Sequence, residues 1–239
     1  MKDLLINSDL VFKLLAVHFL IDFCFQPESW IKDRDDKKWK SIKLYIHGFL
    51  HSILSYFILG NLFIGFAVII GLVHVIIDPI KLKNKLPDCY RLIIDQFIHI
   101  SIIFLVGLFV LKLNFNVLND LRINWKLIVI YIFISYPTSI FISKFTEHWR
   151  RIIKTESKNE KLLINAGKWI GILERMITVT LIINGQWEGV GFLIAAKSVL
   201  RFGELKIANE RNLTEYVLIG TLLSFGIAIF CGIFLIKYS

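Results

Sequence analysis

The sequence predicts an all-α fold, a polytopic transmembrane helical bundle of about eight helices with both termini on the outer side. Of its 239 residues, 56% are hydrophobic and the mean hydropathy is +0.65, far above the apolar share of soluble domains. The apolar residues form long Leu/Ile/Phe runs rather than the alternating pattern of a membrane β-barrel. The net charge of +9 falls mostly between these runs, so it indicates membrane orientation, and we expect no nucleic acid partner.

The predicted helices follow from the apolar runs, since about 20 apolar residues suffice to cross the hydrocarbon core. In the first half of the chain we expect helices at 10–26, 42–59, 61–80 and 90–111. In the second half we expect them at 126–143, 169–184, 189–203 and 215–236.

Basic residues alternate between the two sides of these helices. Lys and Arg cluster at 32–40, 81–91 and 150–161, whereas the connections near Gly60 and Asn184 carry none. By the positive-inside rule the basic connections are cytoplasmic, so both termini face outward. We expect three parts: a four-helix half at 1–112, a fifth helix with a basic loop at 113–168, and a three-helix half at 169–239.

A short interfacial stretch follows the first helix. Trp30 and Trp39 flank the segment 28–40, which is rich in charged residues. Such a segment can lie on the membrane surface, as an anchor or as a lid over a site.

Ionisable residues are concentrated in four motifs of the first half. Each motif spaces two polar residues by four positions in an apolar run, and together the motifs hold five of the six histidines: His18 with Asp22, His47 with His51, His74 with Asp78, and Asp95 with His99. A spacing of four places both side chains on one face of a helix. Ionisable residues inside a membrane are costly and tend to be functional. The motifs therefore predict one polar site inside a helical bundle.

The alternating directions of the four helices bring the motifs to one depth, near the cytoplasmic leaflet. The eight residues then form two tiers. The shallow tier holds Asp22, His47, Asp78 and Asp95, and the deep tier holds His18, His51, His74 and His99.

The chemistry of these side chains indicates metal binding. Imidazoles and carboxylates from facing helices suit one or two divalent transition metal ions, zinc first, with manganese, iron or nickel also possible. All eight residues are candidate ligands, and Asp22, Asp78 and Asp95 are also candidate catalytic residues. Metal-activated water makes hydrolysis of a phosphoester, ester or amide bond the leading reaction. Which residues bind metal and which act as acid or base stays open.

A second polar set lies in the C-terminal half and comprises Glu174, Arg175, Lys197 and Arg201. Two interpretations stay open. Either Glu174 pairs with Lys197 or Arg175 as a clamp between helices, or the cations bind an anionic head group of a membrane lipid or lipid-like substrate.

Other classes of function use the same residues. A single His–Asp pair is explained by hydrogen bonding between helices, but four pairs in one register favour a site. A transporter or channel for protons or ions predicts a polar path that continues to the outer face. A non-enzymatic membrane protein would use a closed metal site as a structural staple.

Three segments carry a family resemblance: His18-Phe-Leu-Ile-Asp22-Phe-Cys-Phe-Gln26-Pro27, Leu-Val-His74-Val-Ile-Ile-Asp78, and Asp95-Gln96-Phe-Ile-His99. They resemble a bacterial and phage membrane family, domain of unknown function 3307, and the segments 166–175 and 191–202 are similar to its C-terminal part. More distantly, the His/Asp pattern is similar to the YdjM-type inner-membrane proteins, which are described as metal-dependent hydrolases. The resemblances imply a multi-pass protein of the bacterial cytoplasmic membrane, and the second implies a metal role for the His/Asp positions alone.

Overall fold

The computed structural model describes residues 2–60, 63–80, 87–112, 123–152, 160–208 and 211–238, and every regular element among them is helical. The predicted all-α fold is therefore confirmed. The chain divides into two compact units, Met1–Ile132 and Phe133–Ser239. The three-part division expected from the charge pattern stays a prediction.

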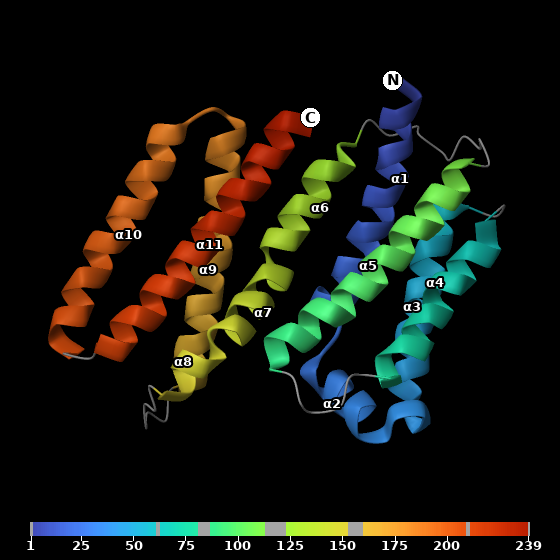
Figure 1. Ribbon diagram of the computed structural model, residues 1–239, viewed down its shortest axis with the longest axis horizontal. Helices are drawn as coiled ribbons and strands as arrows, with labels where there is room; N and C mark the ends of the chain where they lie inside the picture. The colour runs from blue at the N-terminus through green and yellow to red at the C-terminus, as the bar shows by residue number, and fades with distance from the viewer. Residues whose placement is uncertain are drawn as a thin grey trace. The chain divides into compact units, whose positions relative to one another are not determined.

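Unit one is a bundle of four main helices (Figure 1), α1 (Lys2–Phe19), α3 (Ile42–Leu59), α4 (Ile64–Ile77) and α5 (Asp88–Lys112). Short segments extend or join them: a π-helical turn η1 (Leu20–Cys24), α2 (Glu28–Lys37), and the 3₁₀ turns η2 (Lys38–Lys40) and η4 (Asp78–Ile80). α6 (Trp125–Ile134) follows and reaches the boundary between the units.

A sharp bend separates α1 from α2. The segments Asp9–Cys24 and Glu28–Lys40 meet at 87°. Pro27 lies in the bend with φ −64° and ψ 147°, and it has no backbone N–H to continue the preceding helix. Its carbonyl accepts from the backbone N–H groups of Trp30 and Ile31, which starts α2. The predicted interfacial stretch is therefore a separate helix, and it lies against η4 at the end of the bundle where α1 ends and α3 begins (Figure 1).

Two glycines bring α3 and α4 into close contact. A Cβ atom at Gly71 would lie 2.4 Å from the carbonyl oxygen of Gly48 and 1.9 Å from Oγ of Ser52. A Cβ atom at Gly48 would lie 2.8 Å from the carbonyl oxygen of Gly71. Neither position has room for a side chain, so small residues set the distance between these helices, as they commonly do in membranes.

An apolar core fills the part of the bundle beyond the histidines. It contains residues from all four helices: Leu10, Leu14, Leu59, Phe63, Ala67, Ile70, Ile103, Val106 and Val110. Leu14, Ile70 and Ile103 each lie one helical turn from a histidine of the deep tier, and each is 2% exposed.

Unit two contains α7 (Tyr136–Phe145), α8 (Glu147–Ile152), α9 (Glu160–Ile183), α10 (Trp187–Ala208) and α11 (Arg211–Tyr238), with α9 packed against α11 and α10. Gly185, with φ +71°, forms the turn between α9 and α10, a conformation that glycine adopts without strain.

A break separates α6 from α7 at Ser135. Pro137 has no backbone N–H for the carbonyl of Phe133, and the hydroxyl of Thr138 donates to that carbonyl instead, at 2.7 Å. The bonding of the broken helix is thus completed by a side chain at this point.

Helical structure is found within each of the eight predicted ranges, and the helix expected at 42–59 has those bounds. The helix expected at 126–143 is broken at Ser135 into α6 and α7. The number of membrane spans was predicted wrongly, however. Four helical segments of the described residues are long and apolar enough to cross a membrane: Ile42–Leu59, Asp88–Val110, Trp125–Phe145 and Glu215–Tyr238. The bent pair Asp9–Cys24 and Glu28–Lys40 makes a fifth if it counts as one span.

The other predicted spans fail for physical reasons. α4 has 14 residues, so it is about 21 Å long, shorter than a hydrocarbon core of about 30 Å. α9 and α10 each contain five charged residues. Charged residues are costly at the centre of a bilayer. The predicted runs 169–184 and 189–203 each exclude three of the five charges, so they are more apolar than the helices that contain them.

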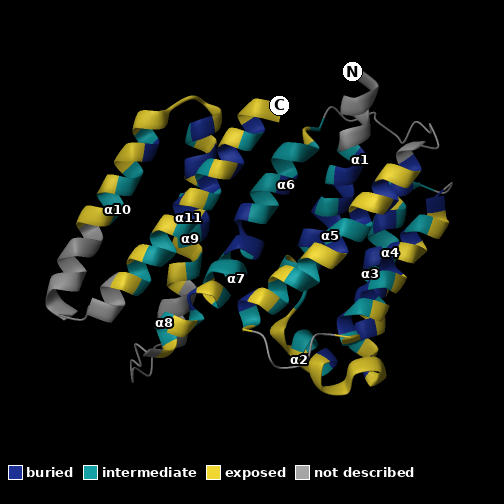
Figure 2. Cartoon of the chain, in the orientation of Figure 1, coloured by how far each residue is buried: buried dark blue, intermediate teal, exposed yellow. Residues whose placement is uncertain are grey.

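Large apolar side chains lie among the exposed residues of the helices, which are yellow in Figure 2. Phe57 on α3, Phe97 on α5 and Phe230 on α11 are more than 70% exposed, and many Ile and Leu side chains accompany them. Large apolar surface of this extent is unusual on a soluble monomer and fits contact with lipid. The chain therefore has several apolar helices of the kind found in membrane proteins.

Candidate metal centre

The eight predicted site residues lie together at one end of unit one. His18 ends α1, Asp22 belongs to η1, His47 and His51 lie on α3, His74 and Asp78 lie on α4 and η4, and Asp95 and His99 lie on α5. The five histidines are at most 2% exposed. Among the carboxylates, the exposed fraction is 7% for Asp78, 9% for Asp22 and 24% for Asp95.

The π-helical turn η1 positions Asp22. A π-helical turn inserts an extra residue into a helix and is frequent at functional sites. From this turn, Oδ1 of Asp22 lies 2.9 Å from Nε2 of His51 and 3.3 Å from Nε2 of His47. The carboxylate of one helix end therefore meets both histidines of α3.

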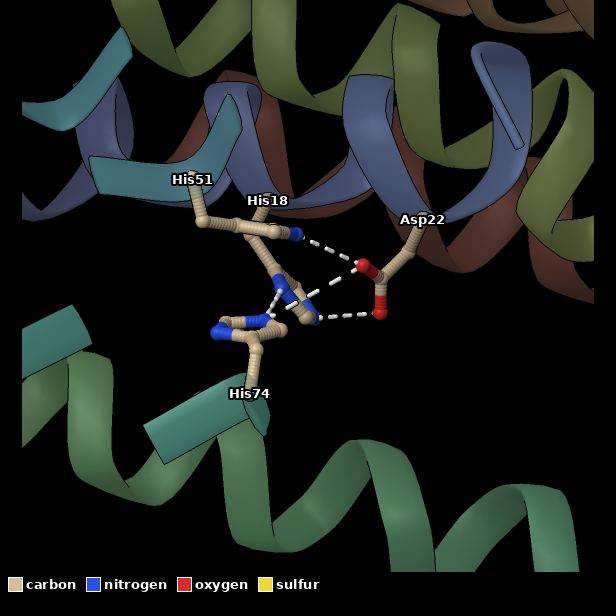
Figure 3. A group of neighbouring side chains, drawn as sticks. All are labelled: His18, Asp22, His51 and His74. Atoms are coloured by element: carbon tan, nitrogen blue, oxygen red, sulfur yellow. Dashed lines mark hydrogen bonds and ion pairs between the residues drawn. The ribbon is translucent and has the colours of Figure 1, made fainter. Parts of the chain in front are cut away.

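A first group of possible metal donors comprises His18, Asp22, His51 and His74 (Figure 3), with one ligand atom from each residue and all four atoms within 4.8 Å of one another. Nδ1 of His18 lies 3.2 Å from Nε2 of His74, which in turn lies 4.0 Å from Oδ1 of Asp22. Two ligands of a tetrahedral ion at about 2.05 Å are about 3.3 Å apart. The separations of 2.9, 3.2 and 4.0 Å scatter around that value, so the four residues could hold one ion.

Backbone carbonyls select the tautomer of two histidines. Nδ1 of His74 lies 2.8 Å from the carbonyl of Ile70, and Nδ1 of His99 lies 2.8 Å from the carbonyl of Asp95. A carbonyl only accepts, so in each ring Nδ1 carries the proton and donates. In the neutral ring Nε2 then carries a lone pair, which is the usual arrangement of a metal-ligating histidine.

Gln96 selects the tautomer of His18. Its Nε2 donates to Asp22 Oδ2 at 3.1 Å and to Asp95 Oδ2 at 3.4 Å. Its Oε1 therefore accepts, and Nε2 of His18 donates to it at 3.0 Å. Nδ1 of His18 is left with a lone pair.

The lone pairs of His18 Nδ1 and His74 Nε2 consequently face each other at 3.2 Å. Two acceptors at this distance repel each other unless a proton or a metal cation lies between them. The hydrogen bonds around the site thus leave a place for a cation at the first donor group.

A second donor group comprises Asp78, Asp95 and His99. Nε2 of His99 has no hydrogen-bond partner among the described residues, and it faces Oδ1 of Asp78 at 3.6 Å. A lone pair and a carboxylate oxygen again face each other without a donor. The His74 and His99 rings lie 4.4 Å apart, so the two groups are adjacent.

His47 belongs to neither group and has a different role in the network. Nε2 of Gln26 lies 3.5 Å from Nδ1 of His47, so Nδ1 accepts and Nε2 carries the proton. That Nε2 lies between two carboxylates, 3.3 Å from Asp22 Oδ1 and 3.8 Å from Asp78 Oδ2. His47 is therefore placed as a proton donor to the centre.

Two neighbours of the centre were missed from the sequence. Arg34 on α2 is 6% exposed, and its Nη1 donates to Oδ2 of Asp78. In the sequence it is one of several basic residues after the first helix, and only the bend before α2 brings it to the site. Gln96 carries a signal in hindsight, because it is an amide beside Asp95 in an apolar helix.

The predicted substrate-binding set lies in unit two. Lys197 Nζ forms an ion pair with Oε2 of Glu174. Arg175 is 2% exposed and donates to the carbonyls of Ile134 and Ser135, at 2.5 and 3.2 Å. It also donates to the hydroxyls of Ser139 at 2.5 Å and Ser224 at 2.9 Å.

These bonds favour the clamp over the head-group interpretation for Glu174, Arg175 and Lys197. The guanidinium of Arg175 binds the backbone at the break between α6 and α7. The side chain of Arg201 lies outside the described residues.

The comparisons with known proteins agree with the first resemblance. The model of a family described as "Protein of unknown function (DUF3307)" matches residues 10–144, which include all eight residues of the metal centre. The C-terminal segments at 166–175 and 191–202 lie beyond this match, and the resemblance to the YdjM-type proteins stays a prediction. No curated protein and no solved structure matches the chain. Because the match covers more than half of the sequence, the chain belongs to the DUF3307 family.

Proposed function

We propose that the chain is a metal-dependent hydrolase of the bacterial inner membrane that acts near the cytoplasmic leaflet on a lipid-like or anionic substrate. One observation carries this proposal: buried lone pairs face one another in two adjacent donor groups, as between His18 Nδ1 and His74 Nε2. Divalent ions between these donors would resolve the repulsion and neutralise the buried carboxylates.

Zinc is the first candidate metal because imidazole and carboxylate ligands suit it, and manganese, iron and nickel accept the same donors. A bound divalent ion would activate water as the nucleophile for hydrolysis at neutral pH. The chain's own residues would hold the ion, orient its ligands and move protons.

The two donor groups differ in how many protein ligands they offer. The first offers four, which completes a tetrahedral shell and is typical of structural sites. The second offers three and leaves one position open, as catalytic sites do. Asp95, the most exposed of the three carboxylates, belongs to this second group. We therefore assign the reaction to the second group and a stabilising role to the first.

A non-enzymatic protein with structural metal is the second candidate function. The closed four-donor shell of the first group favours it. In that case substituting Asp95 would leave the protein's biological activity unchanged. In a hydrolase the same substitution would abolish turnover.

His47 is the chain's candidate for proton transfer. Its Nε2 lies within 4 Å of a carboxylate oxygen in each donor group. A histidine in that position can give a proton to the leaving group and regain one through the carboxylates.

A transporter is less well supported, because the deep histidines meet an apolar layer. Leu14, Ile70 and Ile103 lie one turn beyond His18, His74 and His99, and all three are buried. Ser55, one turn beyond His51, is the polar member of this layer. A proton path to the other side would have to cross these apolar side chains.

Metal analysis of the purified protein tests the proposal. We expect one or two equivalents of a transition metal in the wild type and in His148→Ala, which removes the exposed sixth histidine in α8. In His74→Ala we expect the metal to be lost. Turnover of phosphoester, ester or amide substrates should be lost with it.

If the wild-type protein contains no stoichiometric metal and gains no activity or stability after reconstitution with zinc, manganese, iron or nickel, the proposed function is wrong.

A further inference from the structure

Arg34 is a buried cation at the edge of the metal centre. Its side chain is 6% exposed, although Lys32, Asp35 and Lys37 on the same helix are exposed. Its Nη1 donates to Oδ2 of Asp78, while its buried Nε has no hydrogen-bond partner among the described residues. A buried guanidinium with a free donor is costly, and such groups usually serve a ligand or a network.

The position of Arg34 is set by the docking of α2. Ser41 Oγ, at the start of α3, donates to Asp33 Oδ2 at 2.6 Å. The next residue, Arg34, donates to Asp78 in η4, although α2 follows the bend at Pro27. Two neighbouring residues of α2 are thus tied to two different elements, which holds the guanidinium at Asp78.

The charges of the centre indicate what ligand it needs. Asp22, Asp78 and Asp95 contribute three negative charges and Arg34 contributes one positive charge, which leaves a net charge of two minus. One divalent ion would make the centre neutral. Two divalent ions, one at each donor group, would leave two positive charges in a buried place, and a dianion would restore neutrality.

We propose that Arg34 binds the phosphoryl group of a phosphate monoester at the second donor group. This inference rests on the proposed function and on occupancy of both donor groups. A phosphate monoester supplies the required dianion, and the planar fork of a guanidinium matches its oxygens. In hydrolysis the oxygen of water forms a bond to phosphorus, the phosphorus–oxygen bond to the alcohol breaks, and the alcohol leaves with a proton from water. The products are an alcohol and inorganic phosphate.

Arg34 is better placed to bind this substrate than the cations of unit two. The cations predicted for the task, Arg175 and Lys197, are already bonded within unit two. Arg34 is bonded to a metal-centre residue and still has a buried donor to offer.

Binding of inorganic phosphate to the purified, metal-reconstituted protein tests the inference. Arg34→Gln removes the guanidinium, Arg34→Lys keeps the charge but not the fork, and Lys32→Gln makes the same change of charge at an exposed position of α2. Because it removes a charge-assisted hydrogen bond, Arg34→Gln should raise the Kd for phosphate by at least about tenfold. Arg34→Lys should give a smaller increase, and Lys32→Gln should bind as the wild type does.

Competition with bound phosphate shows whether the substrate that carries the phosphoryl group is a lipid or a soluble molecule. Vesicles containing phosphatidic acid should displace phosphate if the substrate is a lipid, and glycerol phosphate should displace it if the substrate is soluble. Either result supports the inference. Equal displacement by phosphatidylcholine, which is a diester, would contradict it.

Metal content, measured on the same samples, separates this inference from the proposed function. Two results on metal-loaded wild type would make the inference wrong and leave the hydrolase proposal standing. One is that phosphate does not bind to the wild type, and the other is that it binds to Arg34→Gln as tightly as to the wild type. If no metal binds, the hydrolase proposal and the inference that rests on it both fail.

Discussion

The contact between Gly48 and Gly71 makes the geometry of the metal centre sensitive to a single methyl group. In Gly71→Ala, the new Cβ would lie 2.4 Å from the carbonyl oxygen of Gly48, whereas real Cβ contacts stay above 3.0 Å. The carbonyl belongs to the backbone of α3 and cannot rotate aside. α3 and α4 would therefore have to separate by at least about 0.6 Å, the difference between those two distances.

That displacement acts directly on the first donor group. His51 on α3 and His74 on α4 are stacked with ring centroids 3.5 Å apart, and each contributes one ligand atom. Metal–ligand distances tolerate deviations of about 0.2 Å, so a shift of about 0.6 Å exceeds the tolerance threefold. We expect metal affinity to fall at least about tenfold, with a loss of stability of about 1–3 kcal/mol from overpacking.

Competition with a chelator measures this effect on purified protein, with thermal unfolding in the same detergent as a check of folding. Gly65→Ala is the matched control, because it adds the same methyl group to the same helix where nothing lies within 4 Å. If Gly71→Ala keeps the metal affinity of Gly65→Ala, the glycine contact does not set the donor geometry and the reasoning is wrong.

Three other substitutions test single steps of the argument. Gln96→Leu removes the amide that orients His18, and loss of such an outer-shell partner should weaken metal binding about 10- to 100-fold in a chelator titration; unchanged affinity would contradict the tautomer assignment. His47→Gln should keep the metal content but lower kcat about 100-fold or more on a phosphoester, and loss of metal instead would make His47 a ligand. Arg175→Leu leaves two buried carbonyls at the helix break without their guanidinium donor, which costs about 1–3 kcal/mol for each carbonyl. The Tm in detergent should therefore fall clearly. The control substitution Arg150→Gln should not change the Tm.

The convergence of the eight residues was predictable because it depends on two regular quantities. A spacing of four residues fixes the face of a helix, and alternating helix direction fixes the depth. His18 and His74 lie near the C-terminal ends of α1 and α4, whereas His51 and His99 lie in α3 and α5. Because α1 and α4 run in the opposite direction to α3 and α5, these side chains meet at one level (Figure 1). Neither quantity requires knowledge of side-chain packing.

The number of spans was not predictable in the same way. Hydropathy averages over a run and does not register where a helix begins, so it does not reveal the short length of α4. Arg34 was missed because the sequence does not give the direction of the segment 28–40. In the sequence it lies 12 residues beyond Asp22 in a basic stretch, and only the 87° bend turns that stretch back onto the centre.

The protonation pattern of the histidines links local structure to the chemistry of the site. His74 and His99 each bond the carbonyl four residues earlier in their own helix, which directs Nε2 away from the backbone. One of them belongs to each donor group, so each group contains a ring whose lone pair is directed by its own helix rather than by a neighbour. The ring of His18 is instead oriented by Gln96 from α5. The first donor group should therefore lose its geometry when α1 and α5 separate, whereas the orientation of His74 and His99 should persist as long as α4 and α5 remain helical.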